Sequence, residues 1–285
     1  MNPTQAESTT LPELRRLGRN CHGYRGETID IDAVLAECVS LARSSGWEVE
    51  QLDPDGKLNL PAFHRRGTAP PGMRIYVSAG IHGDEPAGPL AVRQMFLANS
   101  WPGNVDFWVC PCLNPTGFAV NQRENSIGAD LNREYRRPQA REIIAHIAWL
   151  ERQPCFDLCL CLHEDWESKG FYLYELNPDG LPSLADAIIS KVDKVCPRDD
   201  SEIIDGRKAC GGIIRPDADP RLRRDWPEAF FLLMHKTRLS YTLEAPSDFS
   251  LSVRVDALAT ATTAAVDAAV ASPTSFLSRS GRLPK

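Results

Sequence analysis

The sequence contains no long apolar run. Its longest weakly polar stretch, residues 257–271, is rich in alanine and threonine, carries Asp267 and is too short to span a bilayer. The first 16 residues also lack the apolar core of a secretory signal. We therefore expect a cytoplasmic protein that does not interact with a membrane.

A surplus of positive charge is missing as well. The 32 Lys and Arg residues are outnumbered by 38 Asp and Glu residues, which gives a formal net charge of -6 at pH 7. Because nucleic-acid binding depends on Lys and Arg side chains that neutralise phosphates, this balance argues against a nucleic acid as a partner. The 285 residues, 42% of them hydrophobic, are enough to bury a substantial core.

The nine cysteines do not show the C-x-x-C spacing of zinc ribbons and thioredoxin-like sites. They include a C-P-C at 110–112 and a C-L-C at 159–161, both within apolar runs typical of strands. An odd number of cysteines cannot pair completely within one chain, and free cysteine packs as a small hydrophobic residue. We expect most of them to be reduced thiols in the core.

Apolar residues alternate between strand and helix spacing along most of the chain. Helical spacing predicts helices at 32–45, 87–98, 138–153, 184–195 and 252–271. Strand patterns occur at 47–53, 57–66, 74–78, 105–114, 156–165, 170–176 and 238–246, whereas 116–137 and 196–228 are predicted to be mostly loop. This alternation predicts an α/β fold, a mixed and mostly parallel central sheet flanked by helices. We expect a lead-in packed on the main domain, the main domain itself and a loose tail, at 1–70, 71–272 and 273–285.

Histidine and glutamate residues follow two of the predicted strands. His82 and Glu85 stand three residues apart in H-G-D-E, directly after the strand at 74–78, and His163 ends the apolar strand at 156–165. Open α/β sheets carry their sites at the C-terminal ends of strands, and two histidines with one glutamate form a ligand set of hydrolytic zinc enzymes. The alternative for His163 is a half-buried core histidine. An H-E-x-x-H zincin helix is excluded, because His163 is followed by E-D-W-E.

Further polar residues accompany this pattern. Four of them stand in the non-periodic segment 114–137, namely Arg123, Asp130, Asn132 and Arg133. Arginine suits the bidentate capture of a carboxylate, although a solvated charged loop would have the same composition. Glu244 ends an apolar strand in T-L-E-A-P, so it is either a general base near a metal or a surface residue.

Together these motifs resemble the zinc metallocarboxypeptidases of the carboxypeptidase A clan. The resemblance is strongest to short bacterial forms such as murein peptide amidases and to the succinylglutamate desuccinylase/aspartoacylase group. It covers about residues 73–270 and rests on H-G-D-E at 82–85, N-P-x-G at 114–117, D-L-N-R at 130–133, and on Arg123, His163 and T-L-E-A-P at 242–246.

On the metal side, the resemblance implies that His82, Glu85 and His163 hold one zinc ion per chain. It also implies that Asp130 accepts a hydrogen bond from a zinc-bound imidazole and so fixes the tautomer of that ring.

On the substrate side, the resemblance implies that Arg123 polarises the scissile carbonyl group. Asn132 and Arg133 would hold the terminal carboxylate of the substrate. Glu244 would act first as general base and then as general acid. The result would be a Lewis acid, an activated water, a cation and a proton carrier in one place.

Two features depart from the family pattern. Peptide-cleaving carboxypeptidases carry a tyrosine on a loop before the base, but no tyrosine stands between Glu175 and Ser240. Trp226 or His235 could cap the site instead, or nothing does. The segment 164–167 after the second histidine is unusually acidic, which would either favour a cationic substrate group or pair with arginines of the loop 207–224.

The resemblance implies zinc-dependent hydrolysis of an amide bond, with removal of a C-terminal residue from a peptide or peptide-like substrate as the expected reaction. The alternative is deacylation of an N-acyl amino acid at the same site. A third hypothesis is a member that binds zinc or a ligand without turnover, which the presence of both Arg123 and Glu244 disfavours. The sequence does not indicate the oligomeric state.

Overall fold

This computed structural model describes residues 14–20, 22–24, 26–53, 55–68, 72–217 and 219–271. The strands of this part of the chain form one sheet. Its strands are β1 (Glu48–Gln51), β2 (Pro61–Arg65), β3 (Met73–Ala79), β4 (Val105–Cys110), β5 (Leu158–Asp165), β6 (Tyr172–Leu176), β7 (Ile203–Ile204), β8 (Arg207–Cys210), β9 (Ile213–Ile214) and β10 (Ser240–Pro246). The helices are α1 (Ile31–Ser44), α2 (Ala87–Leu97), α3 (Pro115–Phe118), α4 (Arg141–Arg152), α5 (Ala185–Val192), α6 (Glu228–His235) and α7 (Leu251–Ala271), with short 3-10 helices η1 (Leu131–Arg133) and η2 (Pro220–Leu222).

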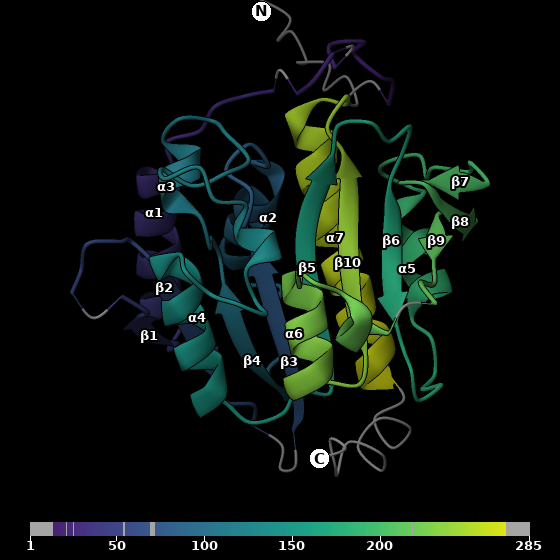
Figure 1. Cartoon of the computed structure of the whole chain (residues 1–285). Helices are drawn as coiled ribbons and strands as arrows, with labels where there is room; N and C mark the ends of the chain where they lie inside the picture. Colours follow the sequence, from purple (N-terminus) through teal and green to yellow (C-terminus); the bar gives the residue numbers. More distant parts are fainter. Residues whose placement is uncertain are drawn as a thin grey trace, which may run out of the picture.

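Parallel strands occupy the centre of the sheet (Figure 1). The strand order is β1-β2-β4-β3-β5-β10-β6-β9-β8-β7, and β4, β3, β5 and β10 all run parallel. Antiparallel pairs flank this centre, with β1 and β2 next to β4 and with β6 next to β10. The predicted fold class, a mixed α/β sheet flanked by helices, is confirmed.

The segment predicted as a lead-in contributes two strands to this sheet. β2 pairs with β4, and Phe63 lies opposite Val109. The loop after β10 also holds the N-terminal segment, because Asp248 accepts hydrogen bonds from the backbone nitrogens of Gly18 and Arg19. The boundary at residue 70 stays a prediction, and the tail predicted at 273–285 lies outside the described residues.

Alternating side chains of the central strands build one core on each face of the sheet. In β5, Leu160 and Leu162 belong to one core, whereas Cys159 and Cys161 belong to the other. Because side chains alternate along a strand, His163 points to the same face as the two cysteines. The period of β5 therefore decides which face carries the histidine.

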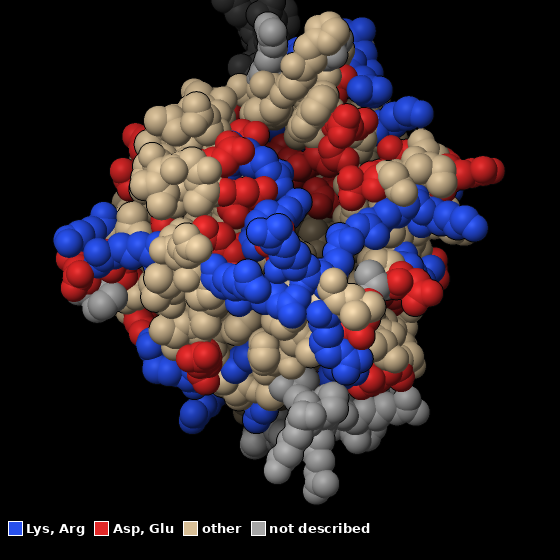
Figure 2. All heavy atoms as spheres, in the orientation of Figure 1, with Lys and Arg blue, Asp and Glu red and all other residues tan. Residues whose placement is uncertain are grey.

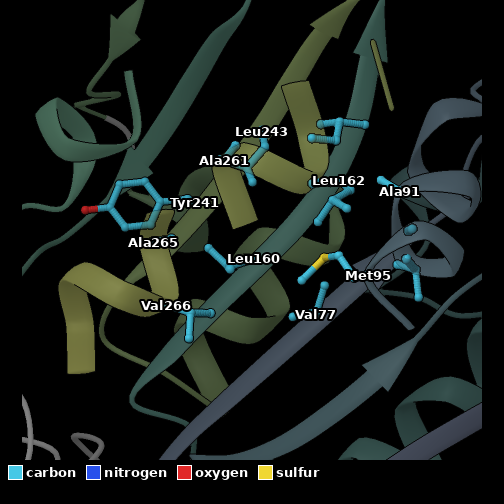
Figure 3. Close-up of a cluster of buried hydrophobic side chains, with 14 of the residues drawn as sticks. Val77, Ala91, Met95, Leu160, Leu162, Tyr241, Leu243, Ala261, Ala265 and Val266 are labelled. Carbon is cyan, nitrogen blue, oxygen red and sulfur yellow. The ribbon is translucent and has the colours of Figure 1, made fainter. Parts of the chain in front are cut away.

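The core on the leucine face packs against α2 and α7 (Figure 3). Leu160 and Leu162 of β5 lie there with Ala91 of α2 and with Ala265 and Val266 of α7, all of them buried. Each fully buried leucine stabilises the fold by roughly 1.5–3 kcal/mol. Helices on this face therefore anchor the strands that carry the site on the opposite face.

A buried polar network underlies α6 on the histidine face. The carboxylate of Glu228, the first residue of α6, accepts hydrogen bonds from the hydroxyls of Tyr76 at 2.7 Å and Ser78 at 2.9 Å. The Tyr76 hydroxyl also lies 2.9 Å from Nε2 of His146. Burial raises the pKa of Glu228 to about 7. The sequence did not predict α6, because its residues are apolar on nearly every side and show no amphipathic period.

The eight described cysteines are free thiols and six of them are buried, as expected. Among the described residues, no helix is both long enough and apolar enough to cross a membrane.

Candidate active site

The predicted site residues gather where three central strands end. His82 follows β3 by three residues, His163 stands near the end of β5, and Glu244 stands near the end of β10. Because β3, β5 and β10 are parallel neighbours, these three ends meet at one edge of the sheet.

Three buried side chains converge at this edge. Nδ1 of His82 lies 2.5 Å from one carboxylate oxygen of Glu85, and Nδ1 of His163 lies 3.0 Å from the other. One ligand atom from each residue lies within 4.8 Å of the other two. The structure thus brings together the three residues that the sequence singled out, and their role as zinc ligands stays a prediction.

This donor set fits a zinc ion. Two imidazole nitrogens and one carboxylate oxygen are a ligand set of catalytic zinc, which keeps a further position open for water. Nε2 of His82 is buried without a hydrogen bond, and Oδ1 of Asp130 lies 3.6 Å from it. When a proton occupies this Nε2, Nδ1 keeps its lone pair for a metal ion.

The charges of this cluster depend on one another. Burial favours the neutral form of Glu85, but the two neighbouring imidazoles hold the pKa of this carboxyl well below its usual range. Burial also opposes a charge on both histidines. Glu85 and Asp130 nevertheless raise the pKa of His82, whereas burial lowers the pKa of His163. The cluster therefore combines an ionised carboxylate with an imidazole that stays neutral, and both can bind a cation.

Arg123 reaches the cluster from the segment after α3. Its Nε donates a hydrogen bond to Asp130 at 3.0 Å, and its Nη1 lies 3.3 Å from Nδ1 of His82 and 4.0 Å from an oxygen of Glu85. Burial opposes ionisation of Asp130, but the neighbouring imidazole of His82 and the charge of Arg123 lower the pKa of this carboxyl. Arg123 therefore places a positive charge directly beside the cluster.

Close backbone contact explains why Arg123 lies there. A Cβ atom on Gly83 would lie 2.1 Å from the carbonyl carbon of Gly117, so the H-G-D-E and N-P-x-G segments touch. The fully buried side chain of Asn114 accepts a hydrogen bond from the backbone nitrogen of Gly117 at 2.9 Å. Its amide nitrogen donates to the carbonyl oxygen of Arg123 at 3.2 Å. The two motifs therefore form one packed unit.

A cavity of about 730 Å³ opens beside the cluster. Its wall includes Arg123, Asn132, Arg133 and Glu244, so the residues predicted to act on the substrate share one space. Oδ1 of Asn132 accepts a hydrogen bond from the backbone nitrogen of Glu228 at 2.8 Å. The amide nitrogen of Asn132 is thus the donor that remains for a ligand.

Glu244 is half-buried in this cavity. Burial, together with the nearby carboxylates of Glu85 and Asp165, raises its pKa well above the usual value, and the charge of Arg123 opposes this shift. A carboxyl group whose pKa is raised in this way can donate a proton as well as accept one.

The acidic run at 164–167 is partly engaged within the protein. Glu164 forms a buried ion pair with Arg254 of α7, and Asp165 accepts a hydrogen bond from a tyrosine of β6. None of the described arginines in the loop 207–224 pairs with this run. Of the two alternatives for this run, pairing with that loop is therefore not found among the described residues.

Neither of the two residues considered as substitutes for the loop tyrosine lines the cavity. Trp226 is buried, and its indole nitrogen donates to the carbonyl oxygen of Pro220 at 2.7 Å, while His235 stands at the far end of α6. Tyr172 and Tyr174 of β6 line the cavity instead. Sequence reasoning missed them, although their spacing of two along a strand was a signal that they share a face.

Comparison with known proteins agrees with this arrangement. Residues 71–174 match the model of the succinylglutamate desuccinylase/aspartoacylase catalytic domain. The match includes His82, Glu85, Asn132, Arg133 and His163. The chain is zinc carboxypeptidase-like. The residues after 174, among them Glu244, lie outside that match.

One named relative is similar to this chain in sequence, and solved structures are similar to it in fold. Carboxypeptidase SOL1 of Arabidopsis thaliana is 30% identical over 101 residues, which are 31% of this chain but 18% of that protein. The fold is shared with a protein of Shewanella baltica OS155 that is provisionally named a metallopeptidase, with 24% identity, a TM-score of 0.71 and coverage of 84% of this chain and 92% of that chain. A metallo-carboxypeptidase from Burkholderia cenocepacia has the same fold, with 18% identity, a TM-score of 0.63 and coverage of 86% and 70%.

Proposed function

We propose that this chain is a zinc-dependent hydrolase that cleaves the amide bond next to a free carboxylate, as a carboxypeptidase does on a peptide or peptide-like substrate. The observation that carries the proposal is the shared cavity, in which the His82–Glu85–His163 cluster meets Glu244 and Arg133. The names of the matched domain and of the relatives support a hydrolase.

Substrate binding starts at the carboxylate end. The amide nitrogen of Asn132 and the guanidinium group of Arg133 offer adjacent donors to a planar carboxylate. This contact orients the neighbouring amide bond toward the His82–Glu85–His163 cluster in the same cavity. Holding the two reacting groups in place removes part of the entropic barrier.

The chemistry needs a cation for the carbonyl oxygen and a carrier for the proton. A bound zinc ion would supply a Lewis acid and lower the pKa of a water molecule. Arg123 stabilises the negative charge that develops on the carbonyl oxygen. Glu244 takes a proton from the attacking water and delivers it to the leaving nitrogen, and its raised pKa suits both steps.

N-acyl amino acid deacylation is the second candidate, because the matched catalytic-domain model is that of succinylglutamate desuccinylase and aspartoacylase. Both reactions hydrolyse the amide bond of a residue whose carboxylate is free, so Asn132, Arg133 and Glu244 have the same roles in each. They differ in the size of the acyl part. A small acyl group would need no loop tyrosine to cover it.

An assay of the purified, zinc-loaded protein tests both candidates. The substrates are N-blocked dipeptides, N-acetyl and N-succinyl amino acids, and the C-terminally amidated form of each. We expect amidation to reduce kcat/KM about thirtyfold, or roughly 2 kcal/mol, the low end for removing a partner of a charged group, because Arg133 is exposed. Arg133→Gln should erase this difference, whereas the control Arg137→Gln, outside the cavity wall, should retain it.

Dipeptide turnover would support a carboxypeptidase, and turnover confined to N-acyl amino acids would support a deacylase. Equal rates on free and amidated substrates would contradict both.

A further inference from the structure

Carboxylates are numerous in the wall of the cavity. Figure 2 shows acidic side chains gathered inside the hollow of the molecule. The wall includes the carboxylates of Asp84, Glu85, Glu164, Asp165 and Glu244. Like charges in a buried place repel one another, so such a group of carboxylates calls for a cation close by. The proposed hydrolysis gives roles to Glu85 and Glu244 but none to Glu164.

Glu164 and the proposed metal ligand Glu85 hold each other's segments in place. The backbone nitrogen of Glu164 donates a hydrogen bond to Oε2 of Glu85 at 3.1 Å. In return, Oε1 of Glu164 accepts a hydrogen bond from the backbone nitrogen of Ala87, two residues after Glu85, at 2.5 Å. Two hydrogen bonds that run in opposite directions therefore join the end of β5 to the segment that leads into α2.

The side chain of Glu164 also caps α2. Pro86 occupies the N-cap position and forms no side-chain cap, and Ala87 is the first residue of the helix. The backbone nitrogens of the first helical turn lack partners within the helix, and a negative charge is favourable at this end. Glu164 thus fixes the start of α2 and with it the position of Glu85, two residues before the helix.

A buried arginine holds the carboxylate of Glu164 in turn. Nη1 of Arg254 in α7 donates a hydrogen bond to Oε2 of Glu164, and both side chains are completely buried. A buried ion pair loses the solvation of both charges, and apolar side chains of similar size often stabilise a fold equally well or better. The contribution of this pair is therefore the fixed orientation of Glu164 more than stability.

Arg254 also connects this pair with the N-terminal segment. Its Nη2 donates to Oε2 of Glu27, and Oε1 of Glu27 accepts a hydrogen bond from Nη2 of Arg19 at 2.8 Å. Tyr24 of the same segment lines the cavity. A chain of alternating charges thus runs from Glu164 through Arg254 and Glu27 to Arg19. Its N-terminal members lie outside the matched catalytic-domain model, which begins at residue 71.

We propose that Glu164 and Arg254 are positioning residues that hold Glu85 in the orientation of a metal ligand, and that the N-terminal segment supports them through Glu27. This inference rests on the proposed function, because it takes Glu85 as a zinc ligand. Glu164, Arg254 and Glu27 act through Glu85 and take no part in bond cleavage. The metal site then depends on residues on both sides of the matched segment 71–174.

Replacement of the buried pair by an apolar pair separates positioning from stability. In Glu164→Met/Arg254→Met neither charge of the pair is left alone, and Glu27 keeps Arg19, so the free energy of unfolding should change little. Ala87 loses its acceptor, and we expect the Kd for zinc to rise by about 10–100-fold. Competition with a chelator of known zinc affinity measures this Kd, and urea unfolding of the zinc-free proteins measures stability.

Asp53→Asn is the matched control. Asp53 is also a buried carboxylate that pairs with an arginine, Arg141 of α4, and accepts hydrogen bonds from backbone nitrogens, but it does not line the cavity. This variant should lose stability and keep the wild-type Kd for zinc. An equal loss of zinc affinity in the control and in the double variant would overturn the proposal, and so would an unchanged Kd in the double variant.

Glu27→Gln tests the N-terminal link and decides the matter if the double variant does not fold. The side chain of Glu27 is 29% exposed, so loss of its charge should leave the fold intact. We expect the Kd for zinc to rise, by less than in the double variant, because Arg254 loses one of its two carboxylate partners. A wild-type Kd in Glu27→Gln would overturn the proposal.

Zinc binding separates this inference from the proposed function, because the measurement needs no hydrolysis. Weaker zinc binding in the double variant, with the control unchanged, supports the positioning role even if the wild type cleaves no amide bond. Amide hydrolysis by the wild type, together with equal Kd values for the wild type and the double variant, leaves the proposed function in place and overturns the positioning role.

Discussion

Glu244 and His163 occupy paired positions on the neighbouring parallel strands β10 and β5. Thr242 and Cys161 form the preceding pair on that face, and all four residues line the cavity. A shift of β10 by one residue would turn Glu244 toward the apolar face of the sheet. Strand register, and not a flexible loop, therefore places the proposed base beside the proposed metal ligand.

This relationship makes Glu244→Gln a sharp test of the mechanism. The amide keeps the shape of the side chain but cannot accept the proton, so we expect kcat and kcat/KM to fall together by about 10²–10⁴-fold. The acidic limb of the kcat/KM profile, which the raised pKa of Glu244 moves toward neutral pH, should disappear. Zinc content, measured by elemental analysis, should stay normal. Near-normal turnover in this variant would remove Glu244 from the mechanism.

Zinc retention should depend on His163. His163→Ala removes one of three converging donors, so the purified variant should carry much less zinc than the wild type after dialysis against a weak chelator. His64→Ala is the control, because His64 lies on β2 and contacts Glu48 instead of the cluster. Equal zinc in the wild type and in the His163 variant would show that His163 is no ligand.

Gly83→Ala should disturb the site without touching a ligand. The new Cβ would lie 2.1 Å from a backbone carbon of Gly117, and relieving such a clash typically costs about 1–3 kcal/mol. We expect a lower unfolding temperature and weaker zinc binding, because His82 and Glu85 flank this glycine. Gly103→Ala, where a Cβ meets no atom within 4 Å, should be close to neutral. If both variants behave like the wild type, the contact between the two loops has no structural importance.

Glu228 should make the stability depend on pH. Burial raises its pKa to about 7 in the folded protein, whereas an unfolded glutamate titrates near roughly 4.3. The folded state then binds more protons in this interval, so the free energy of unfolding falls as the pH rises from about 4 to 7, by at most about 1.4 kcal/mol per pH unit. Urea unfolding at several pH values should show this slope in the wild type and a flatter one in Glu228→Gln. The exposed Glu151→Gln serves as control, and identical slopes in all three proteins would exclude a titrating Glu228.

The elements that carry the cluster could be predicted because each follows a simple rule. In β5, leucine and cysteine alternate up to His163, and this period marks a buried strand without knowledge of its neighbours. Parallel strands end at the same edge, so His82 and His163 could be expected to lie near each other before any contact was known. Rules of this kind need information from one short segment at a time.

The remaining features depend on contacts between distant segments. Arg254 pairs with Glu164 across 90 positions, and no local pattern in either segment indicates that partner. Helix α6 packs on the sheet and lines the cavity with Ala229 and Phe230, so it is apolar on nearly every side and its sequence has no helical stripe. Arg223 and Arg224 line the cavity on a segment that lies beside Tyr135, because the backbone nitrogen of Tyr135 donates to the carbonyl oxygen of Trp226. Sequence spacing does not encode this contact.

The position of β10 has a consequence for the order in which the protein matures. Among the described strands it is the last to be synthesised, yet it inserts between β5 and β6. Until residues 240–246 leave the ribosome, β5 keeps one edge unpaired, and an apolar strand with an open edge favours association with other chains. A chain interrupted before Ser240 would already contain His82, Glu85 and His163 but would lack Glu244. During biosynthesis the proposed metal ligands therefore precede the proposed proton carrier, and catalytic competence comes last.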